Sequence, residues 1–192
     1  MTKNVKVAGV GMIPFTKPGQ SDDYPIMGET AARIAIEDAG IKYSDIGQAY
    51  VGYVYGDSTA GQAAVYGLGM TGIPVINVNN NCATGSSALF LARQAVESGM
   101  VDCALALGFE QMVPGALGAV FTDRPNPMKR MFKEMVNVQG IDKRHPVLLS
   151  TLAARVANMP RNLARRTKPL RKYLRKRAYM QPTTPMQYSK SC

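Results

Sequence analysis

Residues 74–99 read PVINVNNNCATGSSALFLARQAVESG, and this stretch decides the fold. It opens with a short apolar run at 74–78 whose length and composition are typical of a buried β-strand. A helical pattern follows over residues 83–98, and Gly99 is expected to end that helix. The apolar positions of the helix recur at the i, i+3, i+4, i+7, i+8 spacing of a core-facing stripe: Ala88, Leu91, Ala92, Ala95 and Val96. A strand leading directly into a helix is the repeating unit of an α/β sheet.

The same alternation continues on both sides of this unit. Upstream, VKVAGVG at residues 5–11 is expected to form a buried strand, and residues 48–55 a second one. A short helix over 61–70, weakened by its own glycines, precedes the strand at 74–78. Downstream, DCALALGF at 102–109 is expected to form a fourth strand with no polar residue inside it. The prediction is an α/β fold with a mostly parallel sheet covered by helices on both faces.

Residues 25–40 are expected to form the first helix of this fold. Gly40 suits the position just past its C-terminal end. One helical face is expected to be apolar and to carry Met27, Ala31, Ile34 and Ala35. After residue 109 the alternation fades, and the proline-containing stretch 114–146 is expected to be irregular, with one short helix near 128–136.

Charge divides the 192 residues into two parts. Residues 1–150 contain 12 Lys/Arg and 13 Asp/Glu, whereas residues 151–192 contain 11 Lys/Arg and no acidic residue. All 18 glycines lie in the first part, and the net charge of +10 comes from the second. We therefore expect one globular domain over residues 1–150 and a basic, disordered tail over residues 151–192.

Composition excludes several classes of protein. Three cysteines and one histidine form neither a disulfide framework nor a zinc-binding spacing. No secretory signal and no run of about 18 apolar residues occurs, so neither secretion nor a membrane-spanning helix is expected. The pair Gly9 and Gly11 does not make a dinucleotide-binding loop, because Pro14 replaces the third glycine and the next helix begins about ten residues too late.

Cys82 is the candidate catalytic residue, because it lies between the predicted strand at 74–78 and the predicted helix at 83–98. Unpaired N–H groups and a partial positive charge at a helix N-terminus stabilise a thiolate. Such placement lowers a cysteine pKa from about 8.5 into the range of roughly 3.5–7.5. The small residues that follow let a substrate carbonyl and its backbone partners come close: Ala83, Gly85, Ser86 and Ser87. The alternative is that Cys82 is only a small packing residue at a strand–helix junction.

Four stretches, taken in sequence order, resemble the thiolase family, and within it the sterol carrier protein x group. They are VAGVGMIPFTKPG at 7–19, NVNNNCATGSSALFLARQAVESG at 77–99, DCALALGFEQM at 102–112 and RPNPMKRMF at 124–132. The stretch around Cys82 is the most specific of the four. The resemblance runs from about residue 5 to residue 149 and implies a truncated thiolase-like domain that includes the start of the family's loop domain.

This resemblance implies a function for Cys82. In thiolases the matching cysteine attacks an acyl-CoA thioester, becomes acylated, and passes the acyl group between 3-ketoacyl-CoA and coenzyme A. Coenzyme A thioesters are then the substrate, and neither a metal nor a redox cofactor is implied. A homodimer, or a heterodimer with a full-length thiolase, is the implied assembly, with the strand at 74–78 at the interface.

Thiolases also use a histidine in a Gly-His-Pro segment and a second acid/base residue, both from later parts of their sequences. The only histidine here is His145, which follows Arg144 rather than glycine and aligns with the excursion after the fourth strand. We interpret His145 as a loop residue and not as the base for Cys82. The expected result is an acyltransferase fragment with little or no turnover alone. The second hypothesis is a non-enzymatic interaction protein that modulates a full-length thiolase or a lipid-transfer relative.

The tail from Thr151 shows no resemblance to the family and is interpreted as an alternative ending, such as that of a splice variant. Three interpretations of it remain open: no function, binding of nucleic acid through RRTKPLRKYLRKR at 165–177, or contact with an anionic membrane surface. The resemblance implies a peroxisomal protein. The final residues Lys190, Ser191 and Cys192 do not match a peroxisomal Ser-Lys-Leu signal, so a cytoplasmic location is the alternative.

Overall fold

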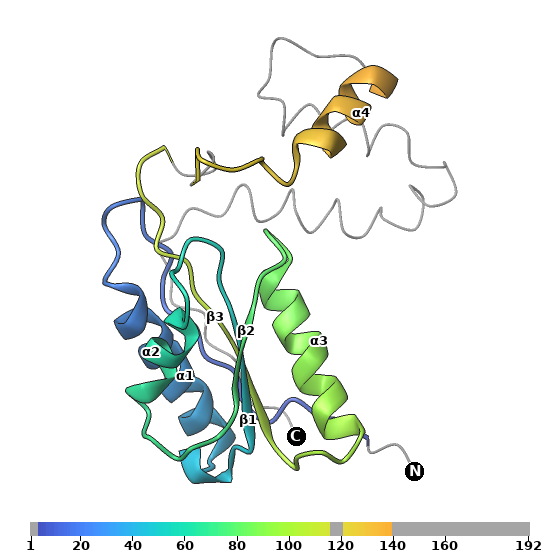
Figure 1. Ribbon diagram of the computed structural model, residues 1–192. Coiled ribbons are helices and arrows are strands. Elements are labelled where there is room, and N and C mark those ends of the chain that lie inside the picture. The colour runs from blue at the N-terminus through green and yellow to red at the C-terminus, as the bar shows by residue number, and fades with distance from the viewer. Residues whose placement is uncertain (1–3, 116–120, 140–192) are drawn as a thin grey trace, which may run out of the picture. The chain divides into compact units, whose positions relative to one another are not determined.

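The computed structural model describes residues 4–115 and 121–139 (Figure 1). The chain divides into two compact units, Met1–Val120 and Phe121–Cys192. The first unit contains the sheet. Its elements are α1 (Tyr24–Ala39), the 3₁₀ turn η1 (Tyr43–Asp45), β1 (Gln48–Gly52), α2 (Ala60–Tyr66), β2 (Val75–Val78), α3 (Thr84–Glu97) and β3 (Ala104–Gly108). The second unit contains α4 (Lys129–Gln139), which confirms the short helix expected near 128–136.

The sheet has three parallel strands in the order β2-β1-β3. Tyr50 of β1 pairs with Ile76 of β2 on one side and with Ala106 of β3 on the other. Helices α1 and α2 cover one face of the sheet, and α3 covers the other (Figure 1). The predicted α/β class, with a parallel sheet and helices on both faces, is therefore confirmed.

The core forms on both faces of β1, because neighbouring side chains of a strand point in opposite directions. Ala49 and Val51 pack in a cluster with residues of α2 and β3, including Ala64 and Leu107. Tyr50 packs on the other face with the buried alanines of α3, Ala88, Ala92 and Ala95. The apolar stripe expected on the helix over 83–98 is thus confirmed, and α3 ends where Gly99, with φ of 79°, follows Ser98.

The prediction of a strand over residues 5–11 is wrong. These residues pair with no strand in the described part of the chain, and Val7 is 74% exposed. Their backbone lies instead against α1, where a Cβ on Gly9 would collide with the carbonyl oxygen of Ala35. The N–H of Val10 donates to the Asp38 carboxylate at 2.9 Å rather than to a neighbouring strand. An apolar run predicts a strand only if its backbone pairs with a neighbouring strand, and here Gly9 and Gly11 pack closely against the backbone of α1 instead.

The predicted helix over 25–40 is confirmed as α1, with Gly40 at φ of 66° after its last residue. Its predicted apolar face is only partly correct. The buried residues are Met27, Gly28 and Ala32, whereas Ile34 is 39% exposed and Ala31 and Ala35 are half-buried. The cause is Gly28, whose missing side chain brings α1 close to α2. A Cβ there would lie 2.8 Å from the Cβ of Ala64.

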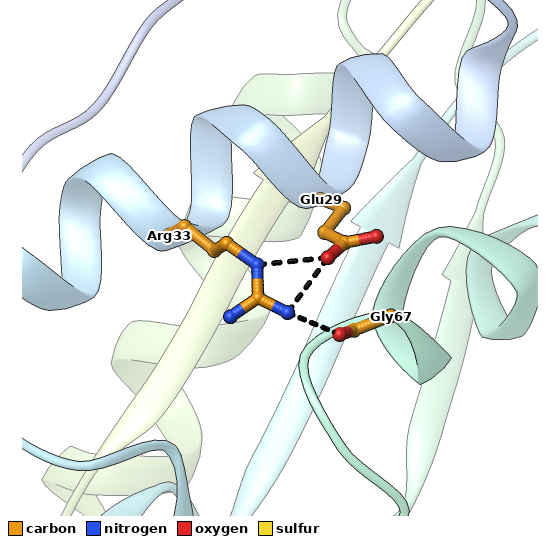
Figure 2. A network of polar contacts seen from close by, with 3 residues as sticks. All are labelled: Glu29, Arg33 and Gly67. Atoms are coloured by element: carbon orange, nitrogen blue, oxygen red, sulfur yellow. Dashed lines mark hydrogen bonds and ion pairs between the residues drawn. The ribbon is translucent and has the colours of Figure 1, made fainter.

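A polar network ties the surface of α1 to the end of α2 (Figure 2). Arg33 donates from Nε to Glu29 at 2.8 Å, one turn earlier on α1, and also donates to the carbonyl oxygen of Gly67. Gly67 follows the last residue of α2, where carbonyl groups lack partners within the helix. The ion pair itself is exposed, and such pairs contribute about 0–1 kcal/mol. The main role of this network is therefore to supply a hydrogen-bond donor to the carbonyl oxygen that follows α2.

Two surfaces of the first unit lack a partner among the described residues. The outer edges of β2 and β3 pair with no described strand, because these two strands are the ends of the sheet order. On α3, Leu89 and Phe90 are 56% and 55% exposed. None of the helices that the structure describes is long and apolar enough to cross a membrane.

Candidate active site at the start of helix α3

The candidate site lies at the edge of the sheet where all three parallel strands end. β1 ends at Gly52, β2 at Val78 and β3 at Gly108, and hydrogen bonds from Tyr53 to Val78 and from Phe109 to Gly52 continue the ladder there. α3 begins at the same edge. Cys82 lies between β2 and α3, and its side chain is exposed. The predicted location of Cys82, between a strand and a helix, is thus confirmed.

Glycines let the first turn of α3 pack directly on the strand ends. A Cβ on Gly52 would lie 2.7 Å from Cγ2 of Thr84 and 3.0 Å from its carbonyl carbon. A Cβ on Gly108 would lie 3.9 Å from the Cα of Gly85. Only glycine allows such close approach of backbone to a neighbouring element without strain. Gly52 therefore fixes how near α3 starts to the sheet, whereas the contact at Gly108 is of ordinary van der Waals length.

The loop before α3 is held by hydrogen bonds around Cys82. The N–H groups of Ala83 and Thr84 donate to the carbonyls of Asn80 and Asn81, at 3.0 and 3.1 Å. Asn81 has φ of 47°, in the left-handed region that asparagine tolerates better than most residues. Cys82 follows this turn directly and precedes the first helical residue by two positions, next to the N–H groups that begin α3.

The second described cysteine contrasts with Cys82. Cys103 precedes β3, at the opposite end of the strands from Cys82, and is half-buried. Burial, together with the nearby charge of Asp45, raises the pKa of the Cys103 thiol. A raised pKa keeps that thiol protonated near neutral pH, and a protonated thiol is a poor nucleophile. Cys103 therefore serves as an internal reference for the reactivity of Cys82.

No histidine lies among the described residues, and His145 falls outside them. The described residues also contain no cluster of three His, Cys, Asp or Glu residues that could hold a metal ion. The described part of the site therefore contains one exposed thiol, backbone N–H groups at the start of α3, and close packing of α3 on a glycine at the end of a strand.

Sequence reasoning missed the residues that support this site from the ends of the other strands. Glu110, just after β3, accepts hydrogen bonds from the N–H groups of Val54 and Tyr55 at 2.9 and 3.0 Å. The ring of Phe109 stacks on Tyr24 and on Tyr53, with centroids 5.1 and 5.2 Å away. These two residues therefore fasten the loop after β1 to the end of β3.

Asn77 of β2 was also missed, although it caps α2. Its Oδ1 accepts the N–H of Gly61 at 3.0 Å, and its Nδ2 donates to Gln62 at 2.7 Å. Thr59, the residue at the N-cap position of α2, makes no side-chain capping hydrogen bond. Asn77 thus does from a neighbouring strand what an N-cap side chain ordinarily does.

Replacing Asn77 with alanine is expected to lower the free energy of unfolding by about 1 kcal/mol, because it removes this cap. Urea unfolding followed by circular dichroism measures the change. Gln62→Ala is the matched control, since it removes only the bond to the Asn77 amide and leaves the cap on Gly61 in place. Equal destabilisation by the two substitutions would contradict the capping role.

Comparison with known proteins adds an independent observation. The family model described as "Thiolase, N-terminal domain" matches residues 5–162. Sterol carrier protein 2 of Gallus gallus is 57% identical over 143 residues, which are 73% of this chain and 26% of that protein. Sterol carrier protein 2 of Homo sapiens is 55% identical over 148 residues, or 76% of this chain and 27% of that protein.

Two more distant matches cover smaller shares of this chain. The benzoylsuccinyl-CoA thiolase subunit BbsB of Thauera aromatica is 35% identical over 112 residues, which are 57% of this chain and 29% of that subunit. The solved priming β-ketosynthase of the R1128 polyketide pathway aligns with a TM-score of 0.44 and 26% identity, over 50% of this chain and 29% of that one. The chain spans about a quarter of the length of the sterol carrier proteins it matches.

Proposed function

The chain belongs to the thiolase family through its N-terminal domain, and from this premise we propose that Cys82 is a nucleophile that accepts the acyl group of an acyl-CoA. One observation carries the proposal: within the matched residues, an exposed cysteine stands directly before the first turn of α3, where the parallel strands end. Ligands of open parallel sheets bind at this edge. Among the described residues, the other thiol is Cys103, which is half-buried and whose raised pKa makes it the weaker nucleophile.

The proposed step exchanges one thioester for another. The Sγ of Cys82, as thiolate, attacks the thioester carbonyl carbon of the acyl-CoA and forms a new C–S bond. The bond from that carbon to the sulfur of coenzyme A breaks, and coenzyme A leaves with the proton that Cys82 gave up. Charge develops on the carbonyl oxygen during attack, and N–H groups of the first turn of α3 beyond Thr84, whose own N–H donates to Asn81, are suited to stabilise it. No oxidant, reductant or metal enters this balance.

The proposed full reaction is acyl transfer between a 3-ketoacyl-CoA and coenzyme A in lipid metabolism. In the direction of breakdown, the Sγ of Cys82 attacks the 3-keto carbon, the bond between C2 and C3 breaks, and acetyl-CoA leaves with a proton added at C2. The acyl group then passes from Cys82 to coenzyme A, and both proton transfers need an acid/base group. The described residues contain no histidine to serve, and the 192-residue chain has only His145. We therefore expect this polypeptide to acylate once and to turn over little or not at all.

A second candidate function is a non-enzymatic role in association with another thiolase chain. The observation that favours it is the open outer edge of β2, together with the exposed Leu89 and Phe90 on α3. Open strand edges and apolar patches are typical of surfaces that bind a partner. Addition of the purified chain to a full-length relative is expected under this alternative to change the activity of that relative. Unchanged activity would leave the alternative without support.

The test of the first proposal is a single incubation with acetoacetyl-CoA, followed by intact-mass measurement. The expected result is one acyl adduct per chain for the wild-type protein, and none above background for Cys82→Ala, because the substitution removes the attacking sulfur. Cys103→Ala is the matched control and is expected to acylate like the wild type. The proposal fails if the wild type forms no adduct, or if the adduct persists in Cys82→Ala.

A further inference from the structure

Thr84 stands out in the candidate site because it is buried while the residues around it are exposed. Its relative exposure is 5%, whereas the five residues before it, Asn79 to Ala83, are all exposed. Among the described residues, Thr84 is the buried polar residue, and the other buried side chains are hydrophobic. A buried hydroxyl is costly unless it is hydrogen-bonded, so its partners indicate its role.

The hydroxyl of Thr84 is bonded in two directions. Its Oγ1 accepts the N–H of Asn80 at 2.9 Å and donates to the carbonyl oxygen of Asn81. These two groups bracket the turn at Asn81, where the backbone is left-handed. The methyl group of Thr84 lies over the Cα of Gly52, which holds the side chain down on the end of β1.

These contacts fix the backbone on both sides of Cys82. Asn80 and Asn81, which precede the cysteine, are hydrogen-bonded to the hydroxyl of Thr84. Thr84 itself follows the cysteine and is the first residue of α3. Cys82 thus lies in a short loop that is closed by hydrogen bonds to Thr84, and Thr84 packs against the end of β1. Such an anchor controls where the thiol stands relative to the first N–H groups of α3.

We propose that Thr84 is the positioning residue for Cys82, acting through its hydroxyl on the turn at Asn81; this inference rests on the proposed acyl transfer by Cys82. Thr84 does not touch the acyl group. Its effect comes through placement of the attacking sulfur, and misplacement of a reacting group by about 1 Å costs on the order of 100-fold in rate. A positioning residue changes the maximum rate of acylation and leaves the acyl-CoA concentration for half-maximal rate nearly unchanged.

The test compares Thr84→Val, which keeps the shape and loses the hydroxyl, with Thr84→Ser, which keeps the hydroxyl. Single-turnover acylation by acetoacetyl-CoA is followed by intact mass over a range of concentrations. For Thr84→Val we expect a maximum rate lower by roughly 10- to 100-fold with an unchanged half-saturating concentration. For Thr84→Ser we expect a maximum rate within about threefold of wild type, because the two hydrogen bonds are retained.

Two further measurements distinguish a loss of acylation rate caused by the turn from one caused by unfolding of the variant. Slow alkylation of the half-buried Cys103 by iodoacetamide verifies that each variant keeps its core. Amide hydrogen exchange of Asn80 is expected to become faster in Thr84→Val and to stay slow in Thr84→Ser. If Thr84→Val exposes Cys103, the pair Asn81→Ala and Asn81→Gly replaces it: both change an exposed side chain, and glycine adopts the left-handed φ that strains alanine. Asn81→Ala is then expected to be slow and Asn81→Gly near wild type.

The outcomes separate the two proposals. A wild-type chain that forms no adduct overturns the proposed function itself. An active wild type with Thr84→Val acylating at the same maximum rate overturns the positioning role alone. The same conclusion follows if Thr84→Ser is as slow as Thr84→Val with Cys103 still protected, because the hydroxyl is then irrelevant.

Discussion

Gly52→Ala is expected to destabilise the first unit by about 3 kcal/mol, although alanine is a small and ordinary residue for a strand. The added Cβ would lie 2.7 Å from the methyl group of Thr84 and 3.0 Å from its carbonyl carbon and oxygen. Two of these three atoms belong to the backbone, so no rotation of a side chain relieves the collision. α3 must move away from the end of β1, which separates Cys82 from its support. Urea unfolding and acylation of Cys82 are therefore both expected to suffer.

Gly85→Ala is the matched control for this substitution. Gly85 directly follows Thr84, which makes all of the close contacts with Gly52, and a Cβ built on Gly85 meets nothing within 4 Å. Because alanine favours helix over glycine, Gly85→Ala is expected to stabilise the protein by roughly 0.5–1 kcal/mol. Opposite signs for two Gly→Ala changes at one junction would demonstrate close packing. Destabilisation below about 0.5 kcal/mol by Gly52→Ala would show that α3 does not rest on β1 as described.

Glu110→Ala is expected to cost about 3 kcal/mol, the second large effect. The Glu110 carboxylate accepts two backbone N–H groups, from Val54 and Tyr55, and both bonds are partly buried. Hydrogen bonds to a charged group contribute about 1.5–3 kcal/mol each, and their donors are left unpaired when the acceptor is removed. The loop after β1 then loses its fastening to β3.

Glu110→Gln isolates the charge from the geometry. Glutamine keeps one oxygen acceptor of the same reach, so we expect it to lose about half as much stability as alanine, or about 1.5 kcal/mol. Thermal unfolding of the three proteins at equal concentration measures the series. Equal losses for glutamine and alanine would mean that both oxygens are needed. No loss for either would mean that solvent replaces the carboxylate at Val54 and Tyr55.

Local patterns predicted most of the elements of the first unit. The helix stripe of α3 and the glycine after α1 depend on residues within a few positions of one another, so they can be predicted from the sequence alone. The segment 5–11 could not be assigned correctly, because its apolar pattern does not reveal that Gly9 and Gly11 pack against α1 rather than beside a strand. The buried face of α1 was predicted only in part for a related reason: it is set by the contact of Gly28 with Ala64, two positions that no helical periodicity connects.

The site shows the same division. Cys82 was identified from its place between a strand and a helix, and its catalytic role remains a prediction. The supports of the site come from long-range contacts: Glu110 bonds to backbone groups 55 and 56 residues earlier in the chain. Thr84 is only two residues from Cys82 but was not singled out, because a threonine in a small-residue run has no pattern that reveals burial. Gly52, inside the apolar run at 48–55, was a signal for this close packing that the sequence contained.

The strand order has a consequence for how the protein is made. β1 lies in the middle of the sheet but is the first of the three strands to leave the ribosome, followed by β2 and then β3 on its other side. When β2 and then β3 are synthesised, the strand that each pairs with, β1, has already been made. Domains fold in the order of synthesis, and long-range pairings are the slow steps. The sheet and the junction that carries Cys82 are thus set to assemble outward from β1 during translation, with α3 docking when β3 emerges.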